Sequence, residues 1–468
     1  MNPTNIPAIN TWLASQGAAG RIAVRDVIIE DDLFPRLQDL LHAAGATHRP
    51  LLVIMDHTPM RRANDNAKTR FLQIANRIAE PTLISLGTPA DPPHADLDIA
   101  RRLATRLPPR ALIISFGSGT ITDLAKHARF LADQNAAAED RRTFVSIPTA
   151  CTVTAFSSAL AVLGVAGVKR TIPSQNPDCV WIDLPLLAGA PMELTRAGVG
   201  DLLARGVAYA DWYLSSLLDI DESYTDTPRL LLAGHEASLP DIAAALARRE
   251  PAAFRRLMEA LLLAGYAMSV VGQTTPISGW EHVMSHYLDL CNTALHKPLN
   301  LHGLQVAAGT FTATRAYNQF LRETNPDDLA AAADTDLAGL AHTQITRHFA
   351  PIDPSGHMRG ELLRDYLPKA HRWQAARLKL SELAAQWPSG RPQKELADRL
   401  MPLDKLTAIA RALDIPRTLT ALDSLPAASS PSDTVKYAHL VRRRFTLGDL
   451  LSALNWLDNR RVATWLST

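Results

Sequence analysis

The chain has 468 residues, more than one hydrophobic core ordinarily serves, so its length predicts two or more domains. Nearly half of the residues are hydrophobic and a fifth are charged, which is the balance of a soluble globular protein. The 48 lysines and arginines nearly cancel the 47 aspartates and glutamates, and a net charge of +1 argues against nucleic acid or a membrane surface as a partner.

Three scattered cysteines, Cys151, Cys179 and Cys291, have no paired spacing. They favour a reducing compartment over a disulfide framework or a thiolate zinc site. The first residues lack a basic region followed by an apolar core, so we expect no signal peptide. The longest apolar stretch, residues 260–271, is interrupted and too short to cross a bilayer. These features predict a cytoplasmic protein without membrane insertion.

Short β-like runs alternate with helical patterns up to about residue 190. The predicted strands are 21–24, 27–29, 51–55, 82–86, 111–114 and 144–147. Predicted helices occupy 33–44 and 96–107, and a further helical pattern follows residue 117. This alternation predicts a largely parallel sheet with helices on both faces, and ligands of such sheets bind beyond the carboxyl ends of the strands.

From about residue 191 the pattern becomes helical. Apolar residues at helical spacing predict helices at 192–215, 242–272, 280–290 and 304–322. Three other stretches are predicted to be a loop, a break between helices and a linker before a final helical pair: 325–335, 388–392 and 425–432. The sequence thus predicts an α/β domain over 1–190 and an all-helical domain over 191–468.

A glycine-rich stretch at residues 116–120 directly follows an apolar run and precedes a helical pattern. In such an arrangement, backbone N–H groups at a helix N-terminus face an anionic ligand, and glycine lets the backbone approach a diphosphate closely. A tight connection without any ligand has the same pattern. On this stretch alone, the two interpretations are about equally supported.

Three potential metal ligands lie in apolar surroundings in the helical half. Asp201 is predicted near the start of an apolar helix, His282 shares a helix face with His286, and His302 directly precedes another helix. One carboxylate and two neutral imidazoles with an open position describe a catalytic divalent-metal site. Each residue also has a structural interpretation, because lone histidines on half-buried helices are often core residues and Asp201 could cap a helix.

Several stretches resemble one enzyme superfamily. Residues 115–126 resemble the glycine-rich loop of the iron-containing alcohol dehydrogenase and dehydroquinate synthase superfamily, and 278–286 and 301–303 resemble its two histidine motifs. The resemblance narrows to the sn-glycerol-1-phosphate dehydrogenases of bacterial type through residues 116–121, 168–173, 190–193, 197–203, 210–212 and 443–450. It covers nearly the whole chain and is weakest between about 325 and 435.

The resemblance implies a dehydroquinate synthase-like fold in which Asp201, His282 and His302 are the metal ligands. Zinc is the usual metal of the family, and these ligand types also suit Ni²⁺ or Fe²⁺. The metal would act as a Lewis acid that stabilises the alkoxide from which hydride leaves. His286, one turn from His282, is expected to relay a proton or contact substrate, with a core histidine as the alternative.

The resemblance also implies a nicotinamide cofactor. Its expected contacts are Gly117, Ser118, Gly119 and Thr120 at the diphosphate, with Asp123, Thr149 and Thr152 nearby. Asp56, at the end of its strand, is placed to bind an adenosine ribose, and its charge would repel a 2′-phosphate, so NAD(H) is favoured over NADP(H). Asp56 could instead be a turn residue before His57.

Two predicted catalytic positions depart from the family pattern. Thr154 stands where relatives carry an aspartate near substrate and nicotinamide, which replaces a charge with a neutral hydroxyl. Arg205, one turn after Asp201, stands where relatives often have lysine, so the charge is kept with a different geometry. The sequence therefore predicts the reaction class better than the substrate.

The leading hypothesis is a metal-dependent NAD(P)-linked dehydrogenase that interconverts a small polyol phosphate and its ketone. The first pair to test is sn-glycerol 1-phosphate and dihydroxyacetone phosphate, a reaction of phospholipid metabolism. One alternative is a related enzyme with another alcohol or sugar-phosphate substrate, including a dehydroquinate synthase-like cyclase. Another is an NAD- and metal-binding protein that has lost catalysis. Such folds often pair, so a homodimer or higher homo-oligomer is expected.

Overall fold

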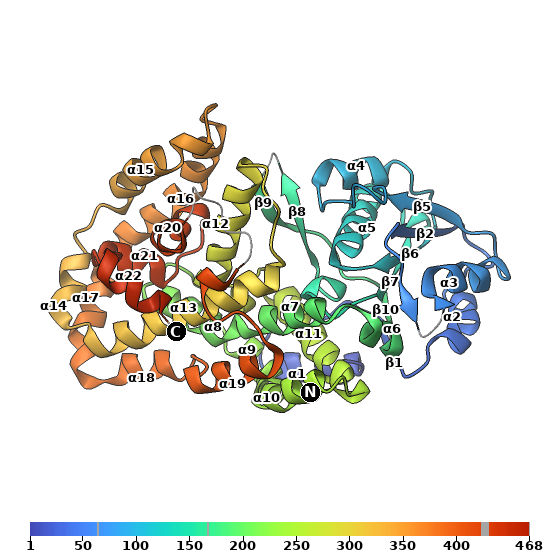
Figure 1. Cartoon of the computed structure of the whole chain (residues 1–468), viewed down its shortest axis with the longest axis horizontal. Coiled ribbons are helices and arrows are strands. Elements are labelled where there is room, and N and C mark those ends of the chain that lie inside the picture. The colour runs from blue at the N-terminus through green and yellow to red at the C-terminus, as the bar shows by residue number, and fades with distance from the viewer. Residues whose placement is uncertain (63–64, 166–167, 423–429, 468) are drawn as a thin grey trace. The chain divides into compact units, whose positions relative to one another are not determined.

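The computed structural model describes residues 1–62, 65–165, 168–422 and 430–467 (Figure 1). Its backbone contacts form two compact units, Met1–Val199 with Thr227–Thr274 and Gly200–Asp226 with Thr275–Thr468. The predicted boundary between residues 190 and 191 concerns separately folding domains, so this division into contact units leaves it a prediction.

The first unit contains a six-stranded sheet in the order β1-β10-β7-β6-β2-β5, in which every pair is parallel. Its strands are β1 (Asp26–Glu30), β2 (Leu51–Asp56), β5 (Thr82–Leu86), β6 (Leu112–Gly117), β7 (Thr143–Pro148) and β10 (Cys179–Asp183). The central strands β2 and β6 are buried almost throughout, as expected of strands covered on both faces.

Five of the six predicted strands are confirmed, and the strand predicted at 21–24 is wrong. Residues 21–25 are irregular although Ile22 and Val24 are buried. Both backbone groups of Ile22 bond to the side-chain amide of Asn10 rather than to a neighbouring strand. A buried apolar run therefore occurs here without a sheet, while the short strand β10 was missed.

Helices cover both faces of the sheet (Figure 1). One face packs on α2 (Leu37–Ala43) and α3 (Ala67–Asn76) in a core that includes Phe71. The other face packs on α4 (Leu97–Ala104) and α5 (Gly119–Asp133) through residues such as Leu124. The predicted helices at 33–44 and 96–107, and the helical pattern after the glycine-rich stretch, are confirmed.

The order of the strands creates a topological switch point between β2 and β6. From β2 the chain crosses by α3 to β5, and from β6 it continues by α5 to β7 on the other side. The helices after β2 and β6 therefore lie on opposite faces, and ligands of such sheets bind beyond the carboxyl ends of the strands at this point. Asp56 ends β2 and Gly117 ends β6, so two predicted cofactor contacts flank this point.

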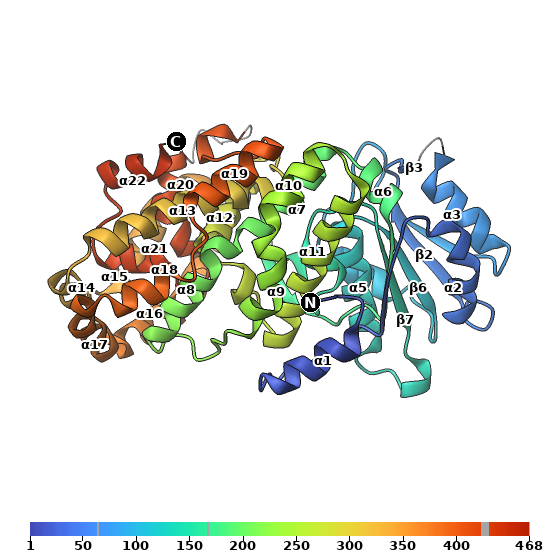
Figure 2. The ribbon, with the colours of Figure 1, turned by 90° about the horizontal axis from the view of Figure 1, so that it is seen from below.

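The rest of the first unit consists of two two-stranded antiparallel sheets and a group of helices, in which α11 packs against α9 and α10 (Figure 2). Its elements are α1 (Ile6–Ser15), β3 (Arg61–Arg62), β4 (Asp65–Asn66), β8 (Leu160–Val165), β9 (Val168–Pro173), α6 (Leu184–Gly189), α9 (Thr227–Ala237), α10 (Leu239–Ala247) and α11 (Pro251–Val271). The helix predicted at 242–272 is two helices, because Pro251 begins α11 and cannot continue α10.

Every regular element in the described part of the second unit is helical. After α7 (Met192–Leu203), which crosses the division, they are α8 (Arg205–Leu217), α12 (Trp280–Ala294), α13 (His302–Glu323), α14 (Pro326–Ala332), α15 (Leu337–His348), α16 (His357–Ala375), α17 (Arg377–Gln386), α18 (Arg391–Ala397), α19 (Leu403–Leu413), α20 (Pro431–Tyr437), α21 (Leu447–Ala453) and α22 (Asn459–Leu466), with short 3₁₀ turns between some of them. The helix predicted at 192–215 is thus α7 and α8.

Outcomes for the three predicted connections differ. The loop predicted at 325–335 contains α14, because Asn325 and Asp328 form a capping box that starts a helix in this polar segment. The break predicted at 388–392 is confirmed, since Gly390 has a φ of 71° between two helical segments. Most of the linker predicted at 425–432 lies outside the described residues, and Pro431 already begins α20.

Among the residues that the structure describes, no helix combines the length and apolarity needed to span a membrane.

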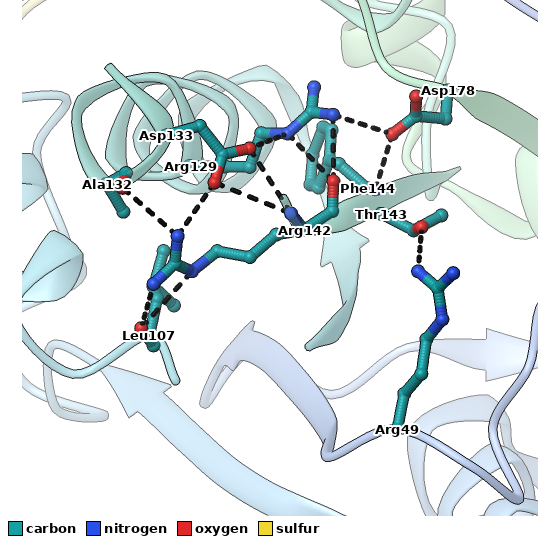
Figure 3. Close-up of polar contacts among 9 residues, drawn as sticks. All are labelled: Arg49, Leu107, Arg129, Ala132, Asp133, Arg142, Thr143, Phe144 and Asp178. Atoms are coloured by element: carbon teal, nitrogen blue, oxygen red, sulfur yellow. Dashed lines mark hydrogen bonds and ion pairs between the residues drawn. The ribbon is translucent and has the colours of Figure 1, made fainter. Parts of the chain in front are cut away.

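A buried ionic clamp joins the end of α5 to the start of β7 (Figure 3). Asp133 pairs with Arg142 at 2.7 Å and with Arg129 at 3.0 Å. Arg142 also donates to Leu107 O, and Arg129 donates to Arg142 O and to Asp178. Asp133, Arg129 and Arg142 are all buried. The clamp therefore fixes the end of α5 opposite to the glycine-rich stretch.

We predict that Asp133→Ala lowers the free energy of unfolding by about 3 kcal/mol, because two buried guanidinium groups lose their shared carboxylate. Arg49→Ala is the control, since Arg49 donates a single 2.6 Å bond to Thr143 Oγ1 at a half-buried site and its loss should cost about 1 kcal/mol or less. Urea denaturation monitored by circular dichroism measures both, and equal losses would contradict the prediction.

Candidate metal centre and cofactor-binding edge

The three predicted metal ligands converge within the second unit. One ligand atom from each of Asp201, His282 and His302 lies within 4.8 Å of the others. Asp201 Oδ1 is 3.4 Å from His282 Nε2 and 3.8 Å from His302 Nε2. Ligands of a tetrahedral zinc ion with bonds near 2.1 Å are separated by about 3.4 Å, so a divalent ion fits this donor set with little movement.

Three helices supply these side chains. Asp201 lies in the last turn of α7, not near a helix start as predicted, because Met192 already begins that helix. His282 stands in the first turn of α12, and His302 is the first residue of α13. A Cβ on Gly200 would lie 2.2 Å from the carbonyl oxygen of Gly303, so glycine is required where α7 approaches α13.

Glu281 orients the imidazole of His282. Its Oε1 accepts a 2.6 Å bond from Gly279 N and lies 3.0 Å from His282 Nδ1. Burial by itself would lower the pKa of His282, but the bonds to Asp201 and Glu281 outweigh burial and raise it. A carboxylate on Nδ1 turns Nε2 toward the metal position, which is how protein carboxylates commonly hold metal-binding histidines.

Sequence reasoning missed Glu281, and it also missed a buried polar cluster beside it. Asp211 accepts bonds from Tyr317 Oη at 2.6 Å, Trp280 N at 2.6 Å and Leu447 N at 2.8 Å. Burial, with the nearby Glu281 charge, raises the pKa of Asp211 to about 7. Burial also lowers the pKa of Arg444 to about 10, although both carboxylates favour its charged form. The sequence signals were a carboxylate directly beside a candidate ligand and the family resemblance at 210–212 and 443–450, to which no role was assigned.

The two predicted catalytic residues of this unit also lie near the ligands in the chain. The ring centroid of His286 is 6.3 Å from that of His282 and 5.7 Å from that of His302, against which it stacks. His286 is half-buried, so the expected proton relay remains a prediction with suitable geometry. Arg205 is buried at the start of α8, one turn after Asp201, and its role also stays a prediction.

Predicted cofactor contacts gather at the carboxyl edge of the sheet in the first unit. Gly117 pairs with Pro148 across β6 and β7, and Thr149 N donates to Gly117 O at 3.2 Å. The predicted contacts Ser118, Gly119 and Thr120 form the start of α5, where Ser118 is the N-cap residue and makes no side-chain cap bond. The first turn of α5 therefore has the uncapped form that suits a diphosphate.

The segment that packs against this turn carries two further predicted residues. A Cβ on Gly119 would lie 2.5 Å from Val153 Cγ2, so glycine allows the segment to pack closely on α5. Thr152 Oγ1 is buried without a hydrogen-bond partner in the described structure, which suits contact with a polar ligand. Thr154 begins the short 3₁₀ turn Thr154–Phe156 and is 8 % exposed.

The remaining two predicted contacts are carboxylates engaged with lysines. Asp56 Oδ1 pairs with Lys68 Nζ, and Asp56 Oδ2 accepts a 2.7 Å bond from Thr58. Burial lowers the pKa of Lys68, with Asp56 opposing that shift. Asp123 pairs with Lys126 at 2.8 Å and accepts from Val162 N. Both carboxylates thus hold the fold locally, and cofactor contact by either remains a prediction.

Solved structures share this fold. A 1,3-propanediol oxidoreductase matches with a TM-score of 0.55 at 15 % identity over 94 % of this chain and 100 % of that one. Sulfoacetaldehyde reductase from Bifidobacterium kashiwanohense, solved with NAD⁺, matches with a TM-score of 0.56 at 14 % identity over 96 % and 99 %. Residues 28–191 match the iron-containing alcohol dehydrogenase family. The chain therefore has the dehydroquinate synthase-like fold of the iron-containing alcohol dehydrogenases.

Curated relatives narrow the class. Glycerol-1-phosphate dehydrogenase (NAD(P)+) of Bacillus licheniformis is 30 % identical over 316 residues, which cover 67 % of this chain and 74 % of the relative. The protein of the same name from Bacillus subtilis is 26 % identical over 349 residues, or 75 % and 82 %. The chain belongs to the glycerol-1-phosphate dehydrogenase family.

We predict that His302→Ala weakens Zn²⁺ binding by more than about 100-fold, since it removes one of three ligands. His371→Ala is the matched control, because His371 is an exposed histidine on α16 of the same unit. Isothermal titration of metal-free protein measures both affinities. Retention of the original affinity in His302→Ala would place the metal elsewhere.

Proposed function

We propose that the chain is a metal-dependent NAD(P)-linked dehydrogenase that interconverts sn-glycerol 1-phosphate and dihydroxyacetone phosphate. The observation that supports it most directly is the convergence of Asp201, His282 and His302 in a chain whose curated relatives are named for this activity. A dehydroquinate synthase-like cyclase receives no comparable support among those relatives.

Asp201, His282 and His302 would hold the divalent ion, and zinc is the first candidate, with Ni²⁺ or Fe²⁺ also compatible. When bound, the ion would supply Lewis-acid polarisation of the substrate oxygen. His286 would exchange a proton between that oxygen and solvent, since its half-buried ring lies beside both histidine ligands. Arg205, one turn from Asp201, would contribute positive charge for an anionic substrate.

The start of α5 and Thr152 would hold the diphosphate of the nicotinamide cofactor. The NAD preference expected from Asp56 assumed an uncompensated carboxylate. Because Lys68 pairs with Asp56, the positive ammonium offsets the charge that would repel a 2′-phosphate. We therefore propose that both NAD(H) and NADP(H) are used.

Thr154 is the reason for considering a second candidate substrate. It is a neutral residue where the family pattern has a carboxylate, so the hydrogen bonds offered to the substrate differ. A related small polyol or sugar phosphate is the alternative. The three cysteines are buried and form no disulfide in the described structure, which supports the predicted cytoplasmic setting. The predicted homodimer or higher homo-oligomer stays a prediction.

The test is reduction of dihydroxyacetone phosphate by Zn²⁺-loaded protein with NADH or NADPH, followed by nicotinamide absorbance. Turnover that requires the metal supports the proposal. If the protein fails to reduce dihydroxyacetone phosphate but reduces another small ketone, that ketone would take its place as the proposed substrate. Metal and cofactor binding without turnover on any ketone or aldehyde would indicate lost catalysis.

We predict that Lys68→Met lowers kcat/KM for NADPH about tenfold relative to that for NADH, because one favourable charge beside the 2′-phosphate is removed. Lys68→Arg is the control and should keep the ratio, since it preserves the charge. Steady-state kinetics with both cofactors give the ratio. An equal loss with both would assign Lys68 a purely structural role through its bonds to Asp56 O and Thr58 O.

We predict that Thr154→Asp raises kcat/KM for dihydroxyacetone phosphate by about tenfold, because the carboxylate of the family pattern is restored. Thr154→Asn, which has the same size without the charge, should leave it within about twofold. Zn²⁺ affinity is measured in parallel and should be unchanged in both. A decrease with Thr154→Asp would show that the pocket is adapted to a neutral residue.

A further inference from the structure

A chain of buried side chains leads away from the second histidine ligand. His302 Nδ1 lies 2.9 Å from Ser285 Oγ. Ser285 Oγ donates to Gln305 Oε1 at 2.6 Å, and Gln305 Nε2 donates to Asp289 Oδ1 at 3.1 Å. Ser285 and Gln305 are fully buried and Asp289 is 5 % exposed, so water is largely kept from competing for these bonds.

Helix spacing explains why these groups meet. Ser285 and Asp289 follow His282 by three and seven residues on α12, so the three share one face of the helix. Gln305 follows His302 by three residues on α13, which packs against α12. The stripe that presents a metal ligand at one end therefore continues, one and two turns later, into the hydrogen-bonded chain.

The direction of every bond in this chain is set from its far end. A carboxylate has only acceptors, so Asp289 must receive the amide N–H of Gln305. The carbonyl oxygen of Gln305 then faces Ser285 and accepts the hydroxyl hydrogen. Ser285 Oγ can only accept from His302, which requires the hydrogen of that imidazole to be on Nδ1. The lone pair of His302 is then on Nε2, the atom 3.8 Å from Asp201 Oδ1.

We propose that Asp289 is a positioning residue of the metal centre, which fixes the tautomer of His302 through Gln305 and Ser285. It does at a distance what Glu281 does directly for His282, whose Nδ1 lies 3.0 Å from Glu281 Oε1. Each ligand histidine is thus paired with a carboxylate that directs Nε2 to the metal. This role rests on the metal centre of the proposed function.

Asp289→Asn is the informative substitution because it keeps the shape of the side chain but no longer fixes the direction of the hydrogen bond to Gln305. An asparagine amide can donate as well as accept, so it can bond to Gln305 Oε1 after the Gln305 amide turns over. Gln305 would then donate to Ser285, and Ser285 would donate to His302 Nδ1. This reversed chain moves the hydrogen to Nε2, where it blocks the metal position.

The first measurement is the tautomer of His302 in metal-free protein labelled with ¹⁵N-histidine. Long-range ¹H–¹⁵N spectra at pH 8 distinguish the two ring nitrogens, and the spectrum of His302→Gln assigns the signal. We expect hydrogen on Nδ1 in the unmodified chain and a mixture or reversal in Asp289→Asn. An unchanged Nδ1–H tautomer in Asp289→Asn overturns the proposal.

The second measurement is the affinity for Zn²⁺ in a double-mutant cycle. Ser285→Ala and Asp289→Asn should each weaken binding by about 10- to 100-fold, the range found for residues that orient metal-binding histidines. The double variant should be no weaker than Ser285→Ala alone, because the chain is already broken at Ser285. Additive losses, or no loss, would overturn the proposal by showing that Asp289 acts independently of Ser285.

Two controls keep the outcomes separate. Asp398→Asn changes an exposed carboxylate in the same unit and should leave the affinity and the tautomer unaltered. If Asp289→Asn does not fold, Ser285→Ala alone must still lose the Nδ1–H preference, and its failure to do so overturns the role. An unmodified chain that binds no Zn²⁺ overturns the metal centre itself. If the unmodified chain and Asp289→Asn bind Zn²⁺ equally tightly, only the role of Asp289 is overturned.

Discussion

The packing of α13 against α7 and α12 is the constraint on which the metal centre depends. The carbonyl oxygen of Gly303 leaves no room for a side chain at Gly200. This close contact sets Asp201 next to the first residue of α13. On the α12 side, hydrogen bonds among buried side chains fix the relation of the two helices. A shift of either helix by one residue would separate the donors, since their positions on the helix faces would rotate by about 100°.

In the first unit, the equivalent constraint is the topological switch point between β2 and β6. It places an uncapped helix start and the end of β2 at one edge of the sheet, which any parallel sheet of this order would do. The residues at that edge are also structural. Asp56 and Lys68 bind the turn after β2, while Asp123 and Lys126 bind the segment after β7 through Val162 N and Ala155 O. A cofactor-binding role would be added to groups already fixed in position.

Sequence patterns predicted the sheet well where burial on both faces produced uninterrupted apolar runs, as in β2 and β6. They failed where a side chain replaced a backbone partner, as Asn10 does for Ile22, and where local capping started a helix in a polar segment at Asn325. The candidate ligand set could be proposed from the sequence because motif and residue type agree, and metal binding by these residues stays a prediction. The sequence could not predict the hydrogen-bonded connection among Ser285, Gln305 and Asp289. It exists only through the register of α12 against α13, and common polar residues give no sequence signal of that register.

The location of Thr154 separates two properties that sequence comparison tends to join. Glu281, which lies beside His282 Nδ1, and Asp289, the proposed positioning residue of His302, belong to the second unit. Thr154 belongs to the first unit, on the segment held by Lys126, whereas the Nδ1 atoms of His282 and His302 contact Glu281 and Ser285 within the second unit. Because both Nδ1 contacts are made within the second unit, neither requires a carboxylate at position 154. A change of substrate preference at this position is compatible with an intact candidate ligand set, so metal binding and substrate identity have to be measured as independent properties of this chain.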